Sequence, residues 1–138
     1  MTTPITLEMR HIVIEDLPEL TENMQMESLI SELSSPLAYR ALSYAWGEEK
    51  NDRLIVIDDA EFYVTANLEC VLRRVQTLRC SLWVDAICIN QKDNAEKSAQ
   101  VRMMKSIYSC AFGVIVWLGE EKPETTALAI NFLNGHIR

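Results

Sequence analysis

The sequence lacks the patterns that identify the commonest nucleotide and metal enzymes. It contains no Gly-x-x-x-x-Gly-Lys loop, no Gly-x-Gly-x-x-Gly after an apolar run and no His-Glu-x-x-His. Those patterns mark P-loop ATPases, dinucleotide-binding dehydrogenases and zinc hydrolases. The four cysteines form no Cys-x-x-Cys pair, so zinc-ribbon and thioredoxin chemistry lack their spacing. The sequence therefore predicts none of these activities and no bound metal.

Positive charge and long apolar segments are also scarce. Lys and Arg number 13 against 20 Asp and Glu, which gives a net charge of −7, whereas nucleic-acid-binding domains usually carry a basic stripe. No apolar run reaches the roughly 18 residues that a membrane-spanning helix needs. Residues 1–10 lack the apolar centre of a signal peptide. We therefore expect no nucleic-acid partner, no membrane span, and a cytoplasmic protein with reduced thiols.

The size and composition of the chain fit one folded domain. A chain of 138 residues has the usual size of a single domain and is short for two. Hydrophobic residues make up 49% and charged residues 24%, which is ordinary for a core with a solvated surface. We expect residues 1–138 to form one domain, either as a whole protein or as the N-terminal part of a longer chain.

An apolar run that ends in polar residues organises the predicted fold. Residues 82–84 have the composition of a buried strand, and they are followed by Asp85 and then by the amides Asn90 and Gln91. A long helix is predicted just afterwards, at residues 94–111. In open α/β sheets, ligands bind at the carboxyl ends of the strands.

The predicted long helix has a start signal and an apolar stripe. Asp93 is expected to cap it, and Glu96 three residues later resembles the second half of a capping box. The expected inner stripe consists of Val101, Met104, Tyr108 and Ala111, with Met103 and Ile107 at its flanks.

The remaining elements follow from periodicity and turn residues. They are a strand at 41–47, a hairpin of 54–57 and 61–64 around Asp58 and Asp59, a helix at 66–78 capped by Thr65 or Asn67, a strand at 114–118 and a helix at about 123–133. The apolar run at 114–118 is typical of a parallel strand buried on both faces. Nearer the N-terminus, 5–8 has a strand pattern, and 12–14 is a second short strand or its continuation. Residues 26–33 form a strand or a helix, and their apolar positions fit a helix face.

Strands that alternate with helices predict the fold class. The pattern indicates an α/β fold with a mainly parallel sheet, right-handed crossovers and flanking helices. The hairpin is expected as an insertion between the first core strand and its helix. Because three strong strands are few for such a sheet, we expect either that the N-terminal strands join it or that the natural chain continues past Arg138.

Three loops should meet at the carboxyl edge of this sheet. They are residues 43–47, 85–91 and 119–121, and they offer a hydroxyl group, aromatic rings, carboxylates and amides. Such a set is suited to a polar ligand with a ring that can stack.

Each of these residues also has a structural interpretation. Asp85 can hydrogen-bond the backbone at a strand end, Asn90 and Gln91 can fix their loop, and the tryptophans can fill the core. Glu120 can be a solvated acid near a helix start. Cys88 lacks a nearby base in the sequence, because the only histidines are His11 and His136.

Three blocks of sequence together resemble the fungal heterokaryon-incompatibility (HET) domain. They are residues 41–47 (ALSYAWG), 83–91 (WVDAICINQ) and 116–119 (VWLG). The middle block is long and specific, and the resemblance covers about residues 38–121. Lys97 and Ser98 differ from the arginine that the family pattern leads us to expect beside Glu96.

The resemblance implies a domain that triggers cell death after non-self recognition between fungal hyphae. HET domains are also distantly similar to TIR domains, which are flavodoxin-like α/β sheets, and many TIR domains hydrolyse NAD with one glutamate near the sheet edge. The sequence shows no clear TIR-type glutamate motif, and Glu120 is the nearest candidate by position. The implied fold is a flavodoxin/TIR-like sheet, and NAD is the implied candidate substrate rather than a bound cofactor.

These observations leave three functional hypotheses. In the first, the edge cleaves NAD, with Glu120 as the catalytic carboxylate and Asp85 as the second candidate. The residues expected to bind the ligand are Ser43, Tyr44, Trp46, Gly47, Asn90 and Gln91. In the second, these residues are structural and the domain acts by self-association or by docking other incompatibility or NLR-type proteins. The third is nucleotide sensing without turnover.

Overall fold

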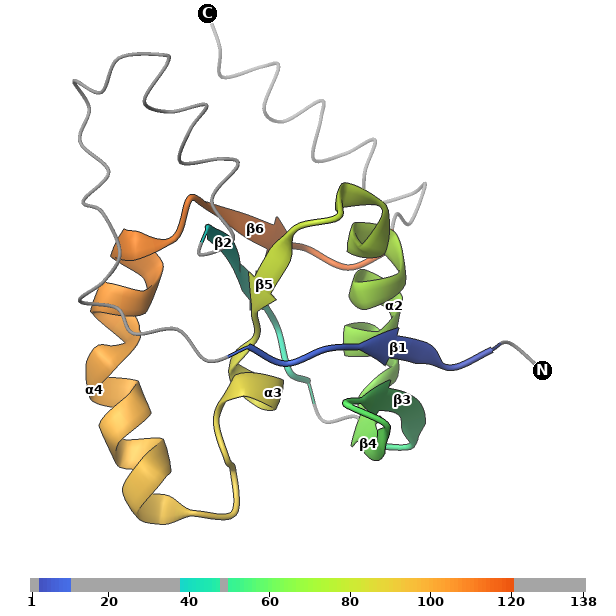
Figure 1. The fold of residues 1–138 in the computed structure, drawn as a ribbon, viewed down its shortest axis with the longest axis horizontal. Coiled ribbons are helices and arrows are strands. Elements are labelled where there is room, and N and C mark those ends of the chain that lie inside the picture. Colours follow the sequence, from blue (N-terminus) through green and yellow to red (C-terminus); the bar gives the residue numbers. More distant parts are fainter. Residues whose placement is uncertain (1–2, 11–37, 48–49, 121–138) are drawn as a thin grey trace, which may run out of the picture.

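A computed structural model of the protein describes residues 3–10, 38–47 and 50–120 (Figure 1). The strand predicted at 12–14, the helix face at 26–33 and the helix at 123–133 lie outside these ranges. Glu121, at the end of the third predicted loop, also lies outside them.

A three-stranded parallel sheet carries the candidate site. Its strands are β2 (Tyr39–Tyr44), β5 (Ser81–Trp83) and β6 (Gly113–Trp117), in the order β5-β2-β6. The central strand β2 runs parallel to both of its neighbours. The predicted co-directional alignment of these strands is confirmed, so the loops that follow them leave from one edge of the sheet.

A second sheet contains the predicted hairpin. Strands β3 (Arg53–Ile57) and β4 (Ala60–Val64) pair antiparallel, and Asp58 and Asp59 between them have φ values of 48° and 64°. Aspartate is among the few residues that tolerate this left-handed conformation. The hairpin lies between β2 and the next helix in sequence, as expected.

The first strand of the chain joins the hairpin rather than the parallel sheet. Strand β1 (Ile5–Leu7) pairs parallel to β3, with Ile5 opposite Ile55. The alternative in which β1 adds to the main sheet is therefore wrong. The physical reason is that Ile5 and Ile55 bury their side chains in the same core, and this pairing places them there together.

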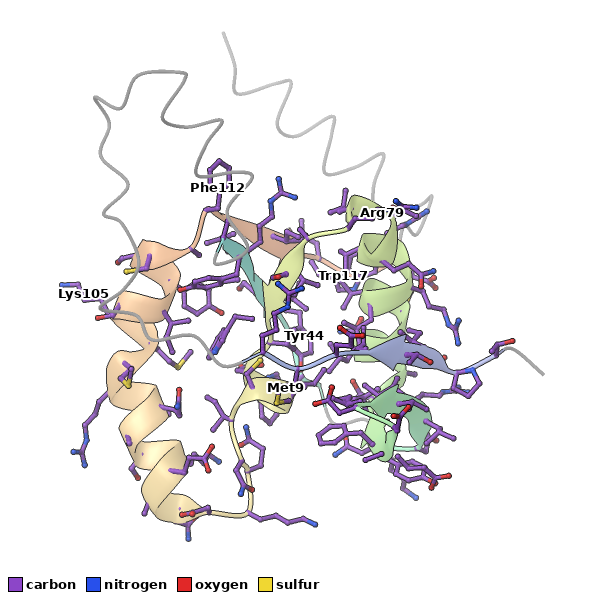
Figure 2. The ribbon with its side chains drawn as sticks, viewed as in Figure 1. Met9, Tyr44, Arg79, Lys105, Phe112 and Trp117 are labelled. Atoms are coloured by element: carbon purple, nitrogen blue, oxygen red, sulfur yellow. The ribbon has the colours of Figure 1, made fainter. Side chains whose placement is uncertain are left out.

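Two long helices flank the parallel sheet. Helix α2 (Ala66–Val75) is capped by the hydroxyl of Thr65 and continues into the short 3-10 helix η2 (Gln76–Leu78). Helix α4 (Asn94–Cys110) is capped by Asp93, and Figure 2 shows Lys105 pointing outward from it. Both predicted helices and the caps Thr65 and Asp93 are confirmed.

Between β5 and α4 the chain forms a one-turn helix that the sequence did not reveal. Helix α3 (Asp85–Cys88) begins two residues after the end of β5, and four residues are too few for a periodic signal. The capping box expected at α4 is also absent, because the carboxylate of Glu96 accepts a hydrogen bond from the backbone N–H of Asn90 instead of Asp93. Glu96 therefore ties α4 to the loop that precedes it.

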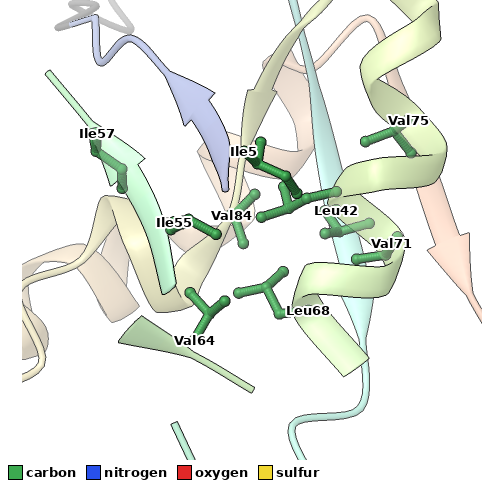
Figure 3. Packing of buried hydrophobic residues seen from close by; sticks show 10 residues of the cluster. Ile5, Leu42, Ile55, Ile57, Val64, Leu68, Val71, Val75 and Val84 are labelled. Carbon is green, nitrogen blue, oxygen red and sulfur yellow. The ribbon is translucent and has the colours of Figure 1, made fainter. Parts of the chain in front are cut away.

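The main hydrophobic core lies between α2 and the two sheets. The α2 stripe is buried together with one face of the parallel sheet and with the second sheet (Figure 3). Its members include Leu42, Ile55, Leu68 and Val71, which are the largest fully buried side chains among the described residues. This core holds α2 beside the carboxyl edge of the sheet.

Helix α4 packs on the opposite face through a smaller cluster. Tyr39, Ala41, Ile107 and Ala111 are buried there. The Tyr39 hydroxyl donates to the backbone carbonyl of Ile107, and burial raises the pKa of Tyr39 to about 12. The predicted inner stripe of α4 is partly wrong, because Val101 is 51% exposed whereas the expected flank residue Ile107 is buried.

Strand β6 is covered on one face only. Ile115 and Trp117 pack against the main core, whereas Val114 and Val116 are 46% and 62% exposed. The prediction that this strand is buried on both faces is therefore wrong for the described residues. The reason is that α4 lies over β2 and β5, where it contacts Ala41 and Trp83, and leaves the same face of β6 open.

We expect Leu42→Ala to lower the free energy of unfolding by about 2–5 kcal/mol, because it leaves a cavity at the centre of the sheet. Leu42 is 1% exposed, whereas Leu118 is 94% exposed. Leu118→Ala is the matched control and is expected to change stability by less than about 0.5 kcal/mol. Urea denaturation followed by circular dichroism measures both, and equal losses in the two variants would contradict this assignment of the core.

Candidate functional site at the carboxyl edge

Side-chain hydrogen bonds join the loops that follow β2 and β5. The indole nitrogen Nε1 of Trp46 donates to both carboxylate oxygens of Asp85, at 3.2 and 3.1 Å. Trp46 lies two residues after β2, and Asp85 is the first residue of α3. Two of the residues that the sequence assigned to this edge are therefore in direct contact.

Helix α2 ties the loop after β2 to the end of β6. The side chain of Asn67 donates from Nδ2 to the carbonyl of Ala45 at 2.9 Å, and its Oδ1 accepts from the indole N–H of Trp117 at 2.9 Å. Asn67 lies in the first turn of α2, next to the helix start that Thr65 caps. Tyr44 and Trp117, which end β2 and β6, appear in Figure 2.

Glu120 lies against α2. The thiol of Cys70 donates to Oε1 of Glu120 at 3.1 Å, and this hydrogen bond, together with burial, raises the pKa of Cys70. Glu120 itself is exposed. Across the residues that the structure describes, no hydrogen bond or ion pair joins Glu120 to Asp85, so the two predicted catalytic carboxylates have separate partners.

Asp85 is a half-buried carboxylate among neutral groups. Burial raises its pKa, while the backbone N–H of Ala86 and the indole of Trp46 lower it. The N–H of Ala86 donates to Oδ1 at 2.7 Å. Both donors stabilise the ionised carboxylate, and they hold it in a fixed orientation at the start of α3.

Two tyrosines lie within electrostatic reach of Asp85. Burial, and then the charge of Asp85, raises the pKa of Tyr44 and of Tyr108. The Tyr108 hydroxyl donates to the carbonyl of Leu42 at 3.1 Å, and its ring packs edge-on against Trp83 at 5.6 Å between centroids. Tyr44 was expected here, whereas Tyr108 had been assigned only to the apolar stripe of its helix.

The amides Asn90 and Gln91 fix the loop between α3 and α4. The Oδ1 of Asn90 accepts from the backbone N–H of Lys92 at 3.1 Å. The Nε2 of Gln91 donates to the carbonyls of Asp85 and Ile89, at 3.0 and 3.3 Å. These contacts match the structural interpretation of both amides, and their role in binding a ligand stays a prediction.

Ser43 and Gly47 lie at the end of β2 and in the loop that follows. Ser43 pairs with Val116 in the register of the sheet, on the face opposite Tyr44. Gly47 has a φ of 67°, a left-handed conformation that glycine adopts without steric strain. Their contribution to ligand binding also stays a prediction.

Asn67 and Tyr108 are residues at this edge that sequence reasoning missed. Asn67 was considered as a helix cap, because asparagine is among the residues preferred at that position. Its place after the hairpin, which returns the chain to the carboxyl end of β2, indicates that the start of the helix is near this edge but not that the Asn67 side chain reaches it.

A cavity of about 980 Å³ extends from the amino ends of β2 and β6 along β5 to α3. Residues from the end of β1, the start of β2, the edge strand β5 and the inner side of α4 line it, including Arg10, Arg40, Arg79, Trp83 and Met103. None of the predicted site residues lines this cavity. Ile87 and Cys88, which belong to the predicted edge loop 85–91, do line it.

The described ranges lack both a membrane-spanning helix and a metal-binding cluster. Within 3–10, 38–47 and 50–120, no helix has the length and apolar character to cross a membrane. The same ranges hold no group of His, Cys, Asp or Glu side chains placed to bind a metal ion. All four cysteines are free thiols.

The structure defines this protein as an α/β protein with a parallel sheet. Side-chain hydrogen bonds join the loops that follow the strands of that sheet. Residues 39–137 match the family described as heterokaryon incompatibility protein (HET). Since this match covers most of the chain, the protein belongs to the HET family, and the resemblance stated from the sequence is confirmed.

The comparison with curated proteins agrees. Heterokaryon incompatibility protein 6, OR allele, of Neurospora crassa is 41% identical over 102 residues. The match covers 63% of this chain and 15% of the Neurospora protein, so the chain spans only a small part of that relative. No solved structure matches this chain, and the finer likeness to flavodoxin and TIR domains stays a prediction.

Replacing Asp85 by asparagine should change how stability depends on pH. Burial raises the pKa of Asp85 in the folded protein. As pH rises, the Asp85 carboxyl group therefore loses its proton at a lower pH in the unfolded chain than in the folded protein. The stability of the wild type relative to Asp85→Asn should therefore fall as pH rises from the ordinary aspartate pKa of roughly 4, and level off above the folded-state pKa.

Urea denaturation at a series of pH values measures this difference. Asp59→Asn, in the exposed hairpin turn, is the matched control for the loss of one carboxylate. If the stability of the wild type relative to Asp85→Asn increased with pH instead, this result would contradict the raised pKa of Asp85.

Proposed function

We propose that this chain is the signalling domain of a fungal incompatibility protein, and that it triggers regulated cell death by cleaving NAD. Membership of the HET family and the identity with the Neurospora protein support a role in non-self recognition. The observation that carries the catalytic part is the half-buried carboxylate of Asp85, held by Trp46 at the carboxyl edge of a parallel sheet. This is the edge at which α/β sheets bind nucleotides.

The reaction breaks the bond between the nicotinamide nitrogen and the ribose carbon. The electron pair of that bond goes to the nicotinamide ring, and water adds to the ribose carbon with loss of a proton, which gives nicotinamide and ADP-ribose. Positive charge develops on the ribose in the transition state, and a fixed carboxylate stabilises it.

Asp85 suits this role better than Glu120. The Asp85 carboxylate is oriented by two N–H donors and is half-buried, where electrostatic interactions are stronger than in water. Glu120 is exposed and accepts a hydrogen bond from the Cys70 thiol. We therefore assign catalysis to Asp85, stacking to Trp46, and a position at the rim of the site to Glu120.

We expect Asp85→Asn to lower the rate of NAD cleavage by about 100-fold or more, the usual effect of removing one group that stabilises transition-state charge. Glu120→Gln should change the rate much less, and Lys105→Ala, on the exposed side of α4, should not change it. Chromatography of nicotinamide released by concentrated protein measures all four forms.

Two results would contradict the proposal that Asp85 catalyses NAD cleavage. One is the absence of nicotinamide at every protein concentration and oligomeric state tested. The other is a folded Asp85→Asn variant that cleaves NAD at the wild-type rate.

A second candidate function is self-association or partner docking without catalysis. The open face of β6 favours it, because Val114, Val116 and Leu118 expose apolar side chains there, and exposed apolar strands tend to pair with other chains. Val116→Glu separates the two candidates in an assay of cell killing, with Tyr63→Glu on the exposed side of the hairpin as its control. Killing that needs Val116 but not Asp85 would favour docking.

A further inference from the structure

The charge of Asp85 has no positive partner among the described residues. Its carboxylate accepts hydrogen bonds from the Trp46 indole and the Ala86 backbone, which are both neutral groups. Across the described ranges, no Lys, Arg or His forms an ion pair with it. A carboxylate half removed from water without a counterion is costly, so a positively charged ligand at this point would be favoured.

One aromatic ring contacts this carboxylate, and the hydroxyl groups of two tyrosines lie within its electrostatic reach. Trp46 contacts Asp85 directly and is 43% exposed, so part of its ring faces solvent. Tyr44 and Tyr108 lie near enough for the Asp85 charge to act on their hydroxyl groups. The faces of such rings attract cations, and tryptophan does so most strongly.

A carboxylate and an indole side by side suit one ligand class, a flat organic cation. The indole attracts the cation more strongly than a neutral ring of the same shape, and only the cation has a charge for the carboxylate to compensate. A metal ion would instead need several oxygen, nitrogen or sulfur ligands, and the described residues offer no such group.

We propose that Asp85 and Trp46 form a subsite for the positively charged pyridinium ring of an oxidised nicotinamide nucleotide. This inference rests on the proposed NAD cleavage and names the part of the substrate that the site selects. It implies that the site discriminates by charge between oxidised NAD and NADH, whose dihydropyridine ring is neutral. Cleavage also converts the ring into neutral nicotinamide, so the product loses the interaction that held the substrate and leaves.

The test compares two small probes that differ in charge and in one methyl group. They are nicotinamide and nicotinamide methylated at its ring nitrogen, titrated into the whole chain at neutral pH while the indole N–H signal of Trp46 is followed by NMR. We expect the methylated cation to bind at least about tenfold more tightly than nicotinamide, in keeping with a cation–π contact beside a partly desolvated carboxylate. High salt should reduce this preference.

Two variants and a control locate the effect. Asp85→Asn should remove the preference for the cation, and Trp46→Leu should weaken its binding, with circular dichroism reporting whether each variant is folded. Lys105→Ala, on the exposed side of α4, should keep the wild-type ratio. Equal binding of the two probes, no binding of either, or an unchanged ratio in folded Asp85→Asn overturns the subsite.

A parallel NAD-cleavage assay separates this inference from the proposed function. Cleavage by a protein that shows no preference for the cation overturns the subsite and leaves the proposed function standing. A charge preference that depends on Asp85 supports the subsite, and if it occurs without cleavage, it is the proposed function that fails.

Discussion

The two hydrogen bonds of the Asn67 side chain hold the carboxyl edge of the sheet together. One fixes the backbone after β2 and the other fixes the indole that ends β6, so a single amide sets the spacing of two strand ends. Each such bond contributes roughly 1 kcal/mol net, and its main effect is to position rather than to stabilise. Asn67 can do this because the main core fixes α2 against the sheet.

The arrangement of the edge follows from this constraint. With the loop after β2 anchored at Ala45, Trp46 extends toward the end of β5 and meets Asp85. The carboxylate then occupies a place with aromatic neighbours and neutral donors but no described cation. The two acidic residues at the edge consequently differ in environment, and this difference separates the proposed catalytic role of Asp85 from the peripheral position of Glu120.

Much of the fold could be predicted because its signals are local. Apolar periodicity located β2, α2 and α4, and the Asp58–Asp59 turn located the hairpin. What failed depends on tertiary packing. Which elements meet decides the partner of β1, the rotation of α4 that buries Ile107 instead of Val101, and the open face of β6. No local sequence pattern records these meetings.

Trp46 and Asp85 could be placed together only because parallel strands share their carboxyl edge. Asn67 and Tyr108 could not be placed there, because the reach of their side chains depends on how the helices dock.

The proposed site depends most on the coupling of the strand-end loops, and the indole protons of Trp46 and Trp117 report on this coupling directly. In an NMR hydrogen-exchange measurement, both should be protected in the wild type, because each donates a hydrogen bond. Asn67→Ala should speed exchange at Trp117, which loses its acceptor, and also at Trp46, whose loop loses its anchor, whereas Gln76→Ala at the exposed end of α2 should change neither. An Asn67→Ala protein in which the Trp46 indole keeps its full protection would contradict the coupling of these loops through α2.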